Sequence, residues 1–264
     1  MTLSFCSFSS GSSGNCYLIK TEKTAVLVDA GISCKRITEG LEKTGTPKEN
    51  LRSILVTHEH WDHVDGIKTM MKKYKDISIH ANNATFTSMK HEVKDERRRY
   101  FVSGDKFTID DLDIETFRVS HDAADPVGYT IKHENKQISV VTDTGTLEEY
   151  AINSIQNSDI LVLESNHDVD MLKMGRYSQF LKERILSERG HLSNEAAGHI
   201  ITSLMKAHDK TRCVLLAHLS QDNNFPEMAE QTVCNILEEN NYYNGQDIYV
   251  KTINRNEISM VYEI

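Results

Sequence analysis

The chain has 264 residues, which is enough for one domain with a sizeable apolar core, and we expect a single domain over residues 1–264. Hydrophobic residues make up 39% and charged residues 26% of it, as in soluble globular proteins, and no apolar run approaches the roughly 20 residues of a membrane span. The formal net charge of −9 argues against a protein that coats polyanions, although two bound divalent cations would make the field inside a cleft positive.

The cysteines and the N-terminus indicate the compartment. The first residues show no basic segment followed by an apolar one, so no signal peptide is visible. Five scattered cysteines with no Cys-x-x-Cys pair are typical of buried thiols in a reducing environment, not of disulfides or a thiolate metal site. We therefore expect a cytoplasmic protein with no membrane contact. The cysteines are Cys6, Cys16, Cys34, Cys213 and Cys234.

Three short apolar runs open the chain and predict strands at residues 5–8, 16–19 and 25–28. Residues 9–15, which join the first two runs, are too polar and glycine-rich to pack in a core. The simpler interpretation of this segment is a hairpin loop. The alternative is a nest of backbone N–H groups and hydroxyls that holds a phosphate.

An acid, Asp29, ends the third predicted strand just before an Ala-Gly turn. At that position its carboxylate can hold a metal-ligating histidine or the backbone of a neighbouring loop. It can equally cap the amphipathic helix predicted over residues 35–43. A strand at residues 52–56 follows and leads into the most informative stretch of the chain.

That stretch, THEHWDHVDG, places three histidines and an aspartate within residues 58–63. It follows a buried strand and precedes apolar positions at helical spacing over residues 64–74, so it lies where sites in α/β sheets occur. Imidazole nitrogen and carboxylate oxygen are ligands that suit zinc, manganese or iron. His58 and His60 can point the same way from an extended segment, while the adjacent Asp62 and His63 can aim at a second point. The spacing indicates two metal ions close together; a polar loop with solvated histidines is the simpler alternative.

The next segments contain few residues with obvious chemistry. A strand is predicted at residues 77–80 and a helix from residue 82 to residue 89. Residues 90–99 are charged and include three consecutive arginines, which is typical of a solvated helical face. A rim that contacts phosphates is the alternative for this run.

Two further candidate ligands follow strands in the same way as His58. A hairpin predicted over residues 107–119 ends just before His121. Strands at residues 127–131 and 137–141 follow, and the second ends just before Asp143 and a glycine turn. His121 at a strand end suits a metal ligand, and one carboxylate oxygen of Asp143 could bridge two metals.

The rest of the chain continues the strand–helix rhythm, which would suit a sandwich of two similar halves. His191 comes just before Ser193, a good N-cap, so its imidazole is expected over the edge of a sheet. His218 ends another apolar run. The predicted strands are 160–163, 213–217, 248–250 and 258–262, and the predicted helices are 172–186, 196–205 and 227–238.

These residues occur in the order of the sequence motifs of the metallo-β-lactamase superfamily, which the chain resembles over essentially its whole length. The resemblance implies an α/β fold of the αββα four-layer sandwich type, with a dinuclear site at the edge where the two sheets meet. The residues that carry it are Asp29, the signature His58, His60, Asp62 and His63, then His121, Asp143 and His218.

By that likeness the ligands form two sets joined by one bridging carboxylate. One metal would be held by His58, His60 and His121, the other by Asp62, His63 and His218, and Asp143 would bridge them.

Later motifs resemble one branch of the superfamily. GHLS at residues 190–193 and LAHLS at residues 216–220 are similar to the late motifs of the nucleic-acid and phosphodiester branch that includes RNase Z. Together with residues 10–18 and 164–168, the pattern resembles the YycJ/WalJ group of bacterial proteins, which is associated with 5′-to-3′ exonuclease activity on double-stranded DNA. Trp61 departs from these signatures, where smaller residues are common, and could narrow one side of the cleft.

The resemblance implies a phosphodiesterase that uses two divalent ions, Mn²⁺ or Zn²⁺, and a metal-activated hydroxide, on DNA with a free 5′ end. Asp62 would orient the nucleophile and accept its proton, and His191 would meet the leaving-group oxygen. His167 is either a substrate contact or an ordinary loop residue. Candidates for gripping a terminal phosphate are Ser12, Ser13, Asn15 and Asn166.

Three other functions remain open at this point. An RNA-processing or cyclic-phosphodiester hydrolase would use the same catalytic set, and only contacts to bases or to the 2′-hydroxyl would distinguish it. A thioester hydrolase of the glyoxalase II kind is disfavoured, because little chain follows His218 and His191 would have no role. A di-iron redox partner of a flavin protein is disfavoured because no flavodoxin-like extension is present.

Overall fold

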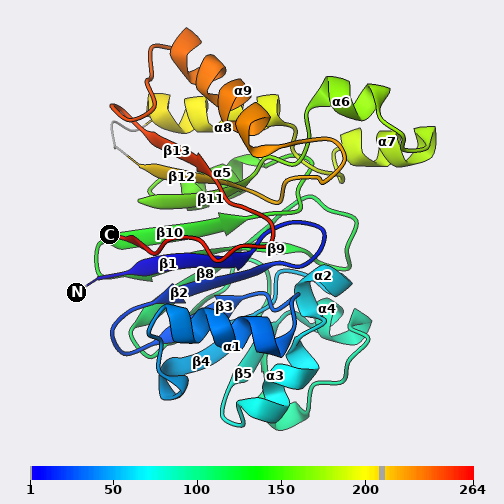
Figure 1. Cartoon of the computed structure of the whole chain (residues 1–264). Coiled ribbons are helices and arrows are strands. Elements are labelled where there is room, and N and C mark those ends of the chain that lie inside the picture. Colours follow the sequence, from blue (N-terminus) through cyan, green and yellow to red (C-terminus); the bar gives the residue numbers. More distant parts are fainter. Residues whose placement is uncertain (1, 208–211) are drawn as a thin grey trace.

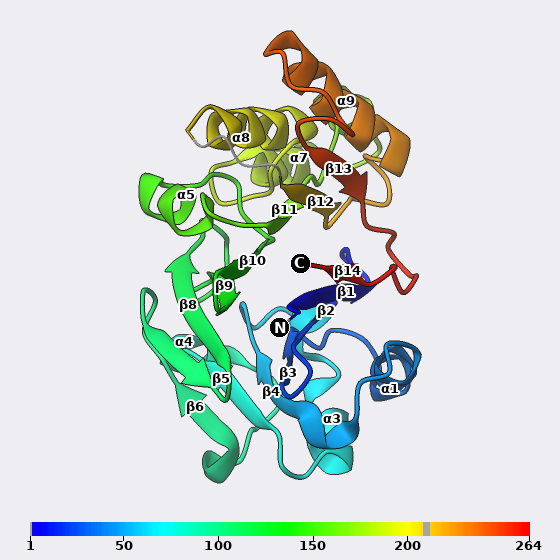
Figure 2. The same ribbon diagram turned by 90° about the vertical axis from the view of Figure 1, so that its left-hand side faces the viewer.

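Two seven-stranded sheets lie face to face in the middle of the molecule, and helices cover their outer faces (Figure 1). The structure is a computed structural model that describes residues 2–207 and 212–264. The arrangement is the αββα sandwich predicted from the sequence. Turned by 90°, the two sheets are seen as separate layers with their helices outside (Figure 2).

The first sheet is built mainly from the N-terminal half of the chain. Its strands β1 to β3 form an antiparallel meander, and β3 to β6 run parallel to one another. A short C-terminal strand closes the other edge by pairing with β1. In spatial order the strands are β14 (Tyr262–Glu263), β1 (Ser4–Ser9), β2 (Cys16–Lys20), β3 (Ala25–Val28), β4 (Leu51–Leu55), β5 (Ser78–Ala81) and β6 (Arg98–Tyr100).

The second sheet repeats this plan. Strands β7 to β10 are antiparallel neighbours, and β10 to β13 are parallel neighbours. The two halves of the chain therefore share one topology. The strands are β7 (Lys106–Ile109), β8 (Leu112–Arg118), β9 (Val127–His133), β10 (Lys136–Val141), β11 (Ile160–Glu164), β12 (Cys213–Ala217) and β13 (Tyr249–Thr252).

Helices pack on the two outer faces, and one pair of helices projects from the sandwich (Figure 1). The first sheet is covered by α1 (Cys34–Lys43) and α3 (Ile67–Lys73), with α2 (Trp61–Val64) and α4 (Asn83–Ser88) near its edge. The second sheet is covered by α5 (Glu149–Ile155), α8 (Asn194–Ala207) and α9 (Pro226–Glu239). The projecting pair is α6 (Val169–Met174) and α7 (Gln179–Leu186), called here the α6–α7 projection.

The strands have apolar side chains on both faces because both faces are buried. In β3, Ala25 and Leu27 pack toward α1 and α3, while Val26 and Val28 pack against the second sheet. This double burial explains why the parallel strands appear in the sequence as continuous apolar runs. Within the two described ranges, no helix is long and apolar enough to cross a membrane. The five cysteines form no disulfide.

The helix predicted over residues 64–74 is wrong in its extent, because two helices, α2 and α3, occupy this region with a break at residues 65–66. Backbone hydrogen bonds that would continue α2 are diverted to the loop after β3: Ala30 N donates to His63 O at 2.8 Å, and Gly66 N donates to Ala30 O at 2.8 Å. A Cβ atom on Gly66 would lie 2.2 Å from Ile32 O, so only glycine permits this approach.

The helix predicted over residues 172–186 is two helices, α6 and α7, and the prediction for residues 90–99 also needs correction. Residues 90–99 form a short 3-10 turn (Asp95–Arg97) and the edge strand β6 in place of a solvated helical face. Their arginines are used locally, since Arg97 Nη1 donates to Ile77 O at 2.8 Å and Arg98 Nε donates to Val93 O at 2.6 Å. Helix α5 was not predicted, because its few apolar residues show no clear helical period.

Candidate active site

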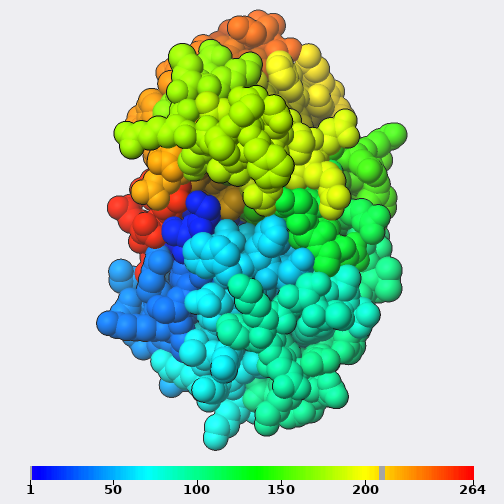
Figure 3. All heavy atoms as spheres, turned by 90° about the vertical axis from the view of Figure 1, so that its right-hand side faces the viewer, coloured from blue at the N-terminus to red at the C-terminus, as the bar shows by residue number. Residues whose placement is uncertain are grey.

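Polar side chains from both sheets converge at the end of the sandwich where the central strands terminate. They follow or end six different strands, so residues far apart in the chain become neighbours. Figure 3 faces this end and shows a hollow that the α6–α7 projection overhangs and that segments near the N-terminus and α2 border from below. The strand-end residues are Asp29 after β3, His58 and His60 after β4, His121 after β8, Asp143 after β10, Glu164 in β11 and His218 after β12.

Three of these residues have a left-handed backbone. The φ angle is +61° at Asp29, +57° at Asp143 and +55° at His218. Non-glycine residues seldom adopt this conformation, and it persists only where the surrounding structure enforces it. The chain turns sharply at each strand end, which directs the side chain into the centre and not along the strand.

Backbone contacts hold α2 against the opening strands. Asn15 N donates to Asp62 O at 2.7 Å, next to the contact of Ala30 N with His63 O. A Cβ atom on Gly31 would lie 1.6 Å from Asp62 O, so this glycine lets the turn after β3 touch α2 directly. The positions of Asp62 and His63 therefore depend on loops after other strands.

The structure brings the seven predicted ligands together. The side chains form four groups, and within each group the nitrogen or oxygen atoms that they offer lie within 4.8 Å of one another. Two of these groups match the two predicted ligand sets. The other two groups contain Asp143, together with His58 and His63 in one and with His218 in the other. The groups are His58, His60 and His121; Asp62, His63 and His218; His58, His63 and Asp143; and Asp143, Glu164, His191 and His218.

Three of the five imidazoles predicted as ligands are oriented by a hydrogen bond from Nδ1 to a carboxylate or carbonyl oxygen, so that Nε2 faces the centre. His63 Nδ1 donates to Asp29 Oδ2 at 2.7 Å, His121 Nδ1 to Gly190 O at 3.2 Å, and His218 Nδ1 to Glu164 Oε1 at 2.7 Å. His60 differs, since its Nδ1 faces His58 Nε2 at 3.0 Å. Such hydrogen bonds are the usual way in which proteins fix the ring orientation of metal-binding histidines.

Asp29 makes both kinds of contact considered for it from the sequence. One carboxylate oxygen accepts a hydrogen bond from Thr57 N at 2.8 Å, which fixes the backbone before the histidine cluster. The other accepts from His63 Nδ1 and from the Thr57 hydroxyl. Helix α1 is capped by Ser33, so Asp29 is not its cap.

The charge balance of the site calls for cations. Burial and the neighbouring His63 hold the pKa of His58 well below its usual range, and burial also lowers the pKa of His121, so both rings stay neutral and can bind a metal. Burial would raise the pKa of Asp143, but His218 and His63 hold it well below its usual range. Burial would lower the pKa of His218, yet carboxylates, Asp143 foremost, raise it to about 10. Without cations, these buried carboxylates therefore draw protons onto the imidazoles.

Two buried atoms at the centre have no hydrogen-bond partner among the described residues. They are Asp143 Oδ2 and His218 Nε2. Buried polar atoms without partners are rare and costly, unless an ion or water satisfies them. These orphaned atoms and the nitrogen–oxygen donor set both fit a divalent metal site.

Glu164 is a site residue for which the sequence analysis predicted no role. Its fully buried carboxylate accepts from His191 Nδ1 at 2.8 Å and from His218 Nδ1 at 2.7 Å through Oε1. Through Oε2 it accepts from Thr144 N at 2.8 Å and from Leu192 N at 3.3 Å. Burial alone would raise the pKa of Glu164, but the two imidazoles, His191 foremost, lower it to about 2. An acid that directly follows an apolar run, as Asp29 does, was the signal that could have identified it.

A cleft of about 360 Å³ opens onto these residues. His191, with 19% of its side chain exposed, lies on the cleft wall beside the buried ligands. Burial would lower the pKa of His191, but Glu164 raises it. The cleft is lined by Ser12, His60, Trp61, Asp62, His121, Asp122, Asp143, Asn166, Tyr177, Leu181, Arg184, Ile185, Gly190, His191, His218 and Ser220.

The five predicted substrate contacts occupy different positions. Ser12 and Asn166 line the cleft, and Ser13 is exposed beside Ser12. Asn15 is fully buried, accepts from Gly11 N at 2.8 Å and lies 3.0 Å from His63 Nε2, so it supports the loop and a ligand. His167 is 1% exposed and does not line the cleft. The arginines of residues 97–99 also lie outside the cleft lining.

The two-sheet sandwich with a histidine–aspartate cluster at the strand ends defines a metallo-β-lactamase-fold protein. The Beta-lactamase superfamily domain matches residues 24–218 of the chain. The chain therefore belongs to this superfamily, and within it to the YycJ/WalJ family, as the similarity to two relatives shows. It is accordingly an enzyme of the metal-dependent hydrolase class.

The relatives cover nearly the whole chain. Exodeoxyribonuclease YycJ of Bacillus anthracis is 40% identical over 250 residues, which are 93% of each protein. Exodeoxyribonuclease WalJ of Streptococcus pneumoniae is 38% identical over 246 residues, which are 91% of this chain and 90% of the relative. Among solved structures, the metallo-beta-lactamase fold protein YhfI from Bacillus subtilis matches with a TM-score of 0.73 at 16% identity, over 100% of this chain and 99% of that one, which shows a shared fold.

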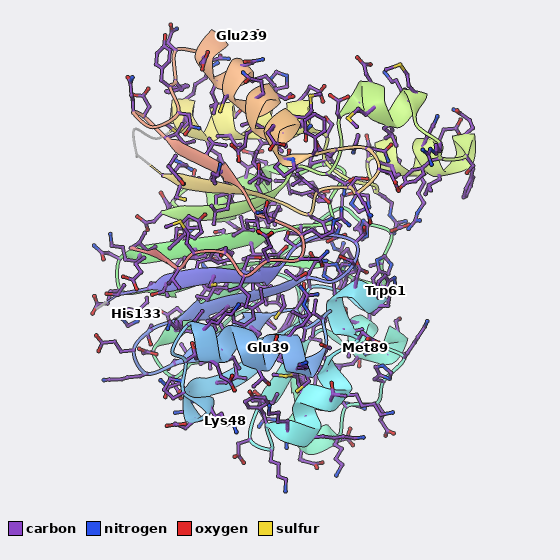
Figure 4. All side chains as sticks on the ribbon, viewed as in Figure 1. Glu39, Lys48, Trp61, Met89, His133 and Glu239 are labelled. Carbon is purple, nitrogen blue, oxygen red and sulfur yellow. The ribbon has the colours of Figure 1, made fainter. Side chains whose placement is uncertain are left out.

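The first prediction concerns Glu164. Glu164→Gln removes the charge that orients His191 and His218, so we expect hydrolytic activity to fall by roughly 10- to 100-fold. Steady-state rates and metal content should be measured together, and the pH profile of the rate should change because His191 loses its charged partner. The matched control is Glu239→Gln, an exposed carboxylate at the far end of α9 (Figure 4), which should leave the rate unchanged. Equal rates for Glu164→Gln and the natural protein would contradict this role.

The second prediction concerns His167, whose ring nitrogens have no hydrogen-bond partner within the described chain. Burial lowers the pKa of His167 to about 4, below the value of about 6.5 expected in the unfolded chain, so the folded state binds fewer protons between these values. The neutral ring therefore contributes stability above pH 6.5 that is lost as the pH falls toward 4. Between pH 7 and pH 4.5 this loss is roughly 2 to 3 kcal/mol. Urea unfolding of chelator-treated protein should show a smaller loss in His167→Leu, and an equal loss in both proteins would contradict the argument.

Proposed function

We propose that this protein is a metal-dependent exodeoxyribonuclease that removes nucleotides from the 5′ ends of double-stranded DNA. The observation that carries the proposal is His191, which lies outside the two predicted ligand sets, is held by Glu164 and faces the same cleft as the ligands. A free imidazole beside a dinuclear cluster is suited to a leaving group that must take up a proton, as the alkoxide of a phosphodiester must. The two relatives named exodeoxyribonucleases support DNA as the substrate.

The site is suited to two divalent ions, Mn²⁺ or Zn²⁺. We assign one to His58, His60 and His121, the other to Asp62, His63 and His218, with Asp143 between them, in accordance with the side-chain groups described above. When bound, such ions neutralise a phosphodiester and lower the pKa of water, so that hydroxide is available near neutral pH. Asp143 Oδ2 and His218 Nε2, which make no hydrogen bond of good geometry among the described residues, support this assignment.

Side chains of the protein accept and donate the protons that the reaction moves. Asp62 lies on the cleft surface, held in place through its backbone by Asn15, and its carboxylate orients the attacking water and accepts its proton. His191 donates a proton to the leaving oxygen from Nε2, because its Nδ1 is engaged by Glu164. The buried carboxylate of Glu164 stabilises the charged form of His191 between turnovers.

Positive side chains near the cleft suit a nucleic acid, despite the negative total charge. Arg255 Nη1 donates to Ser12 Oγ at 3.3 Å and Nη2 to Leu219 O, so a guanidinium lies beside the loop proposed to grip a terminal phosphate. The α6–α7 projection overhangs the cleft and carries Lys173, Lys182 and Arg184, of which Arg184 pairs with Asp122. Such groups hold the phosphate backbone without regard to base sequence.

The contacts to the terminal phosphate and the location of the protein in the cell remain predictions from the sequence. Ser12, Ser13 and Asn166 remain proposed contacts to the terminal phosphate, and a cytoplasmic location remains an expectation. Asn15 and His167 lie too deep for direct contact without rearrangement, so we assign them supporting positions beside the site.

The proposal predicts release of mononucleotides from 5′ ends in the presence of Mn²⁺. End-labelled duplex DNA, single-stranded DNA and RNA should be compared, each with a 5′-phosphate and with a 5′-hydroxyl. We expect 5′-phosphorylated duplex DNA to be degraded fastest. We expect Asp62→Ala to abolish activity and His191→Ala to lower it by roughly 100-fold or more, since general acid catalysis contributes that much.

Matched controls are available on the same elements. Asp65→Ala removes an exposed carboxylate just after α2, and His199→Ala removes an exposed imidazole from α8, which follows His191. Both variants should keep natural rates. Intact DNA after incubation with Mn²⁺ or Zn²⁺, or activity that survives both Asp62→Ala and His191→Ala, would contradict the proposal.

A further inference from the structure

Trp61 is an exposed aromatic side chain in the middle of the ligand cluster. It lies between His60 and Asp62 in the sequence and begins α2, yet 57% of it is exposed. Its neighbours point inward to the metal site, whereas the indole lines the cleft. Figure 4 places Trp61 at the edge of the molecule, on the same side as the α6–α7 projection. The distance between the indole and the reacting centre is therefore fixed by the same helix that carries two ligands.

Helix α7 contributes apolar side chains to the cleft, beside the ion pair of Arg184 with Asp122. Leu181 and Ile185 lie one turn apart on α7 and both line the cleft, as does Tyr177 just before that helix. Together with Trp61, these three side chains give the cleft its apolar parts, while Asp62, Asp143 and the histidines give it a polar part. A ligand with a flat apolar face next to a charged group matches this division, and a nucleotide has both.

We propose that Trp61 is the stacking platform for a nucleobase of one of the two nucleotides that flank the scissile phosphate. This inference rests on the proposed nuclease function and adds a base-binding subsite to it. Stacking on an aromatic ring accepts every base, because each base has a π-face, so the subsite would not select sequence. Base–aromatic stacking is strong enough to matter for the affinity of a single nucleotide.

The subsite has a consequence for duplex substrates. The terminal base has a free outer face, whereas the base of nucleotide 2 can stack on Trp61 only by leaving the duplex stack, so in that case the terminal pairs must open before cleavage. Opening costs less at an A·T end than at a G·C end, because fewer hydrogen bonds and weaker stacking are lost. With the base of nucleotide 2 on the indole, the enzyme should therefore start faster at A·T ends, although it reads no base directly.

The test is a cycle that combines a change in Trp61 with the loss of one base. Natural protein and Trp61→Ala should be assayed on single-stranded, 5′-phosphorylated DNA with an intact base, with an abasic site at nucleotide 1, and with one at nucleotide 2. On intact DNA we expect Trp61→Ala to raise KM by roughly tenfold. On one of the two abasic substrates the proteins should have equal KM, because the base that the indole would contact is missing.

Two variants separate stacking from a structural role. Trp61→Phe keeps an aromatic face and should restore most of the affinity, whereas Trp61→Leu should not. Phe180→Ala is the matched control, because Phe180 is a 79% exposed aromatic residue of α7 that does not line the cleft. It should leave KM unchanged. If Trp61 only positioned His60 and Asp62, its loss would lower kcat and metal content equally on intact and abasic DNA, and that outcome would overturn the inference.

Fluorescence gives a second readout, since Trp61 is the only tryptophan in the sequence. In metal-loaded His191→Ala protein, binding of an intact oligonucleotide should quench the emission, because a stacked base quenches indole. The abasic oligonucleotide that loses the KM effect should bind without this quenching. Equal quenching by both oligonucleotides would contradict stacking. If the natural protein does not degrade DNA at all, the proposed function fails. If it degrades DNA, but Trp61→Ala changes KM equally on intact and abasic DNA, only the Trp61 inference fails.

Discussion

The structure depends on one electrostatic constraint, which is that carboxylates and imidazoles are buried together at the end of the sandwich. Asp29, Asp143 and Glu164 have almost no exposed surface, and most of the histidines around them are equally buried. Buried charges are stable only when paired or bound to metal. Asp29 is satisfied by His63 and Thr57, and Glu164 by two imidazoles and two backbone N–H groups. Among the described residues, Asp143 Oδ2 and His218 Nε2 have no hydrogen-bond partner, which suits a site that binds divalent cations.

Backbone geometry delivers these groups to one place. The strand ends of both sheets meet at one edge, and the left-handed turns at Asp29, Asp143 and His218 direct side chains toward it. The loop after β3 then binds α2 through Ala30 and the tight approach of Gly31, so ligands on α2 cannot move independently of the first sheet. In the second sheet, Glu164 of β11 holds two imidazoles in place: that of His218, a proposed ligand, and that of His191, the proposed proton donor. The site is therefore as rigid as the core beneath it.

The resemblance to the superfamily implied the four-layer architecture and the ligand sets, whereas local patterns located most strands and the polar residues at their ends. Apolar runs bounded by turns identify buried strands, and a histidine or aspartate directly after such a run lies at a sheet edge. The break between α2 and α3 could not be predicted, since it depends on hydrogen bonds to Ala30, which is distant in the chain. The role of Glu164 was missed for the same reason: its partners come from α8's entry loop and from the end of β12. The prediction for residues 90–99 was wrong because two of the arginines donate to carbonyls of neighbouring segments, Arg97 to Ile77 O and Arg98 to Val93 O, in a turn and an edge strand.

The cleft combines a polar part around Asp62, Asp143 and the histidines with apolar side chains contributed by α2 and α7, and a nucleotide has groups that match both. Everything in this account assumes that the polar side holds two cations. A crystal structure of Mn²⁺-loaded protein, with anomalous data collected at the manganese edge, tests this most directly. We predict two anomalous peaks, one among His58, His60 and His121 and one among Asp62, His63 and His218, with Asp143 touching both. A centre with no anomalous peak, in which protonated histidines pair directly with Asp143 and Glu164, would contradict the account.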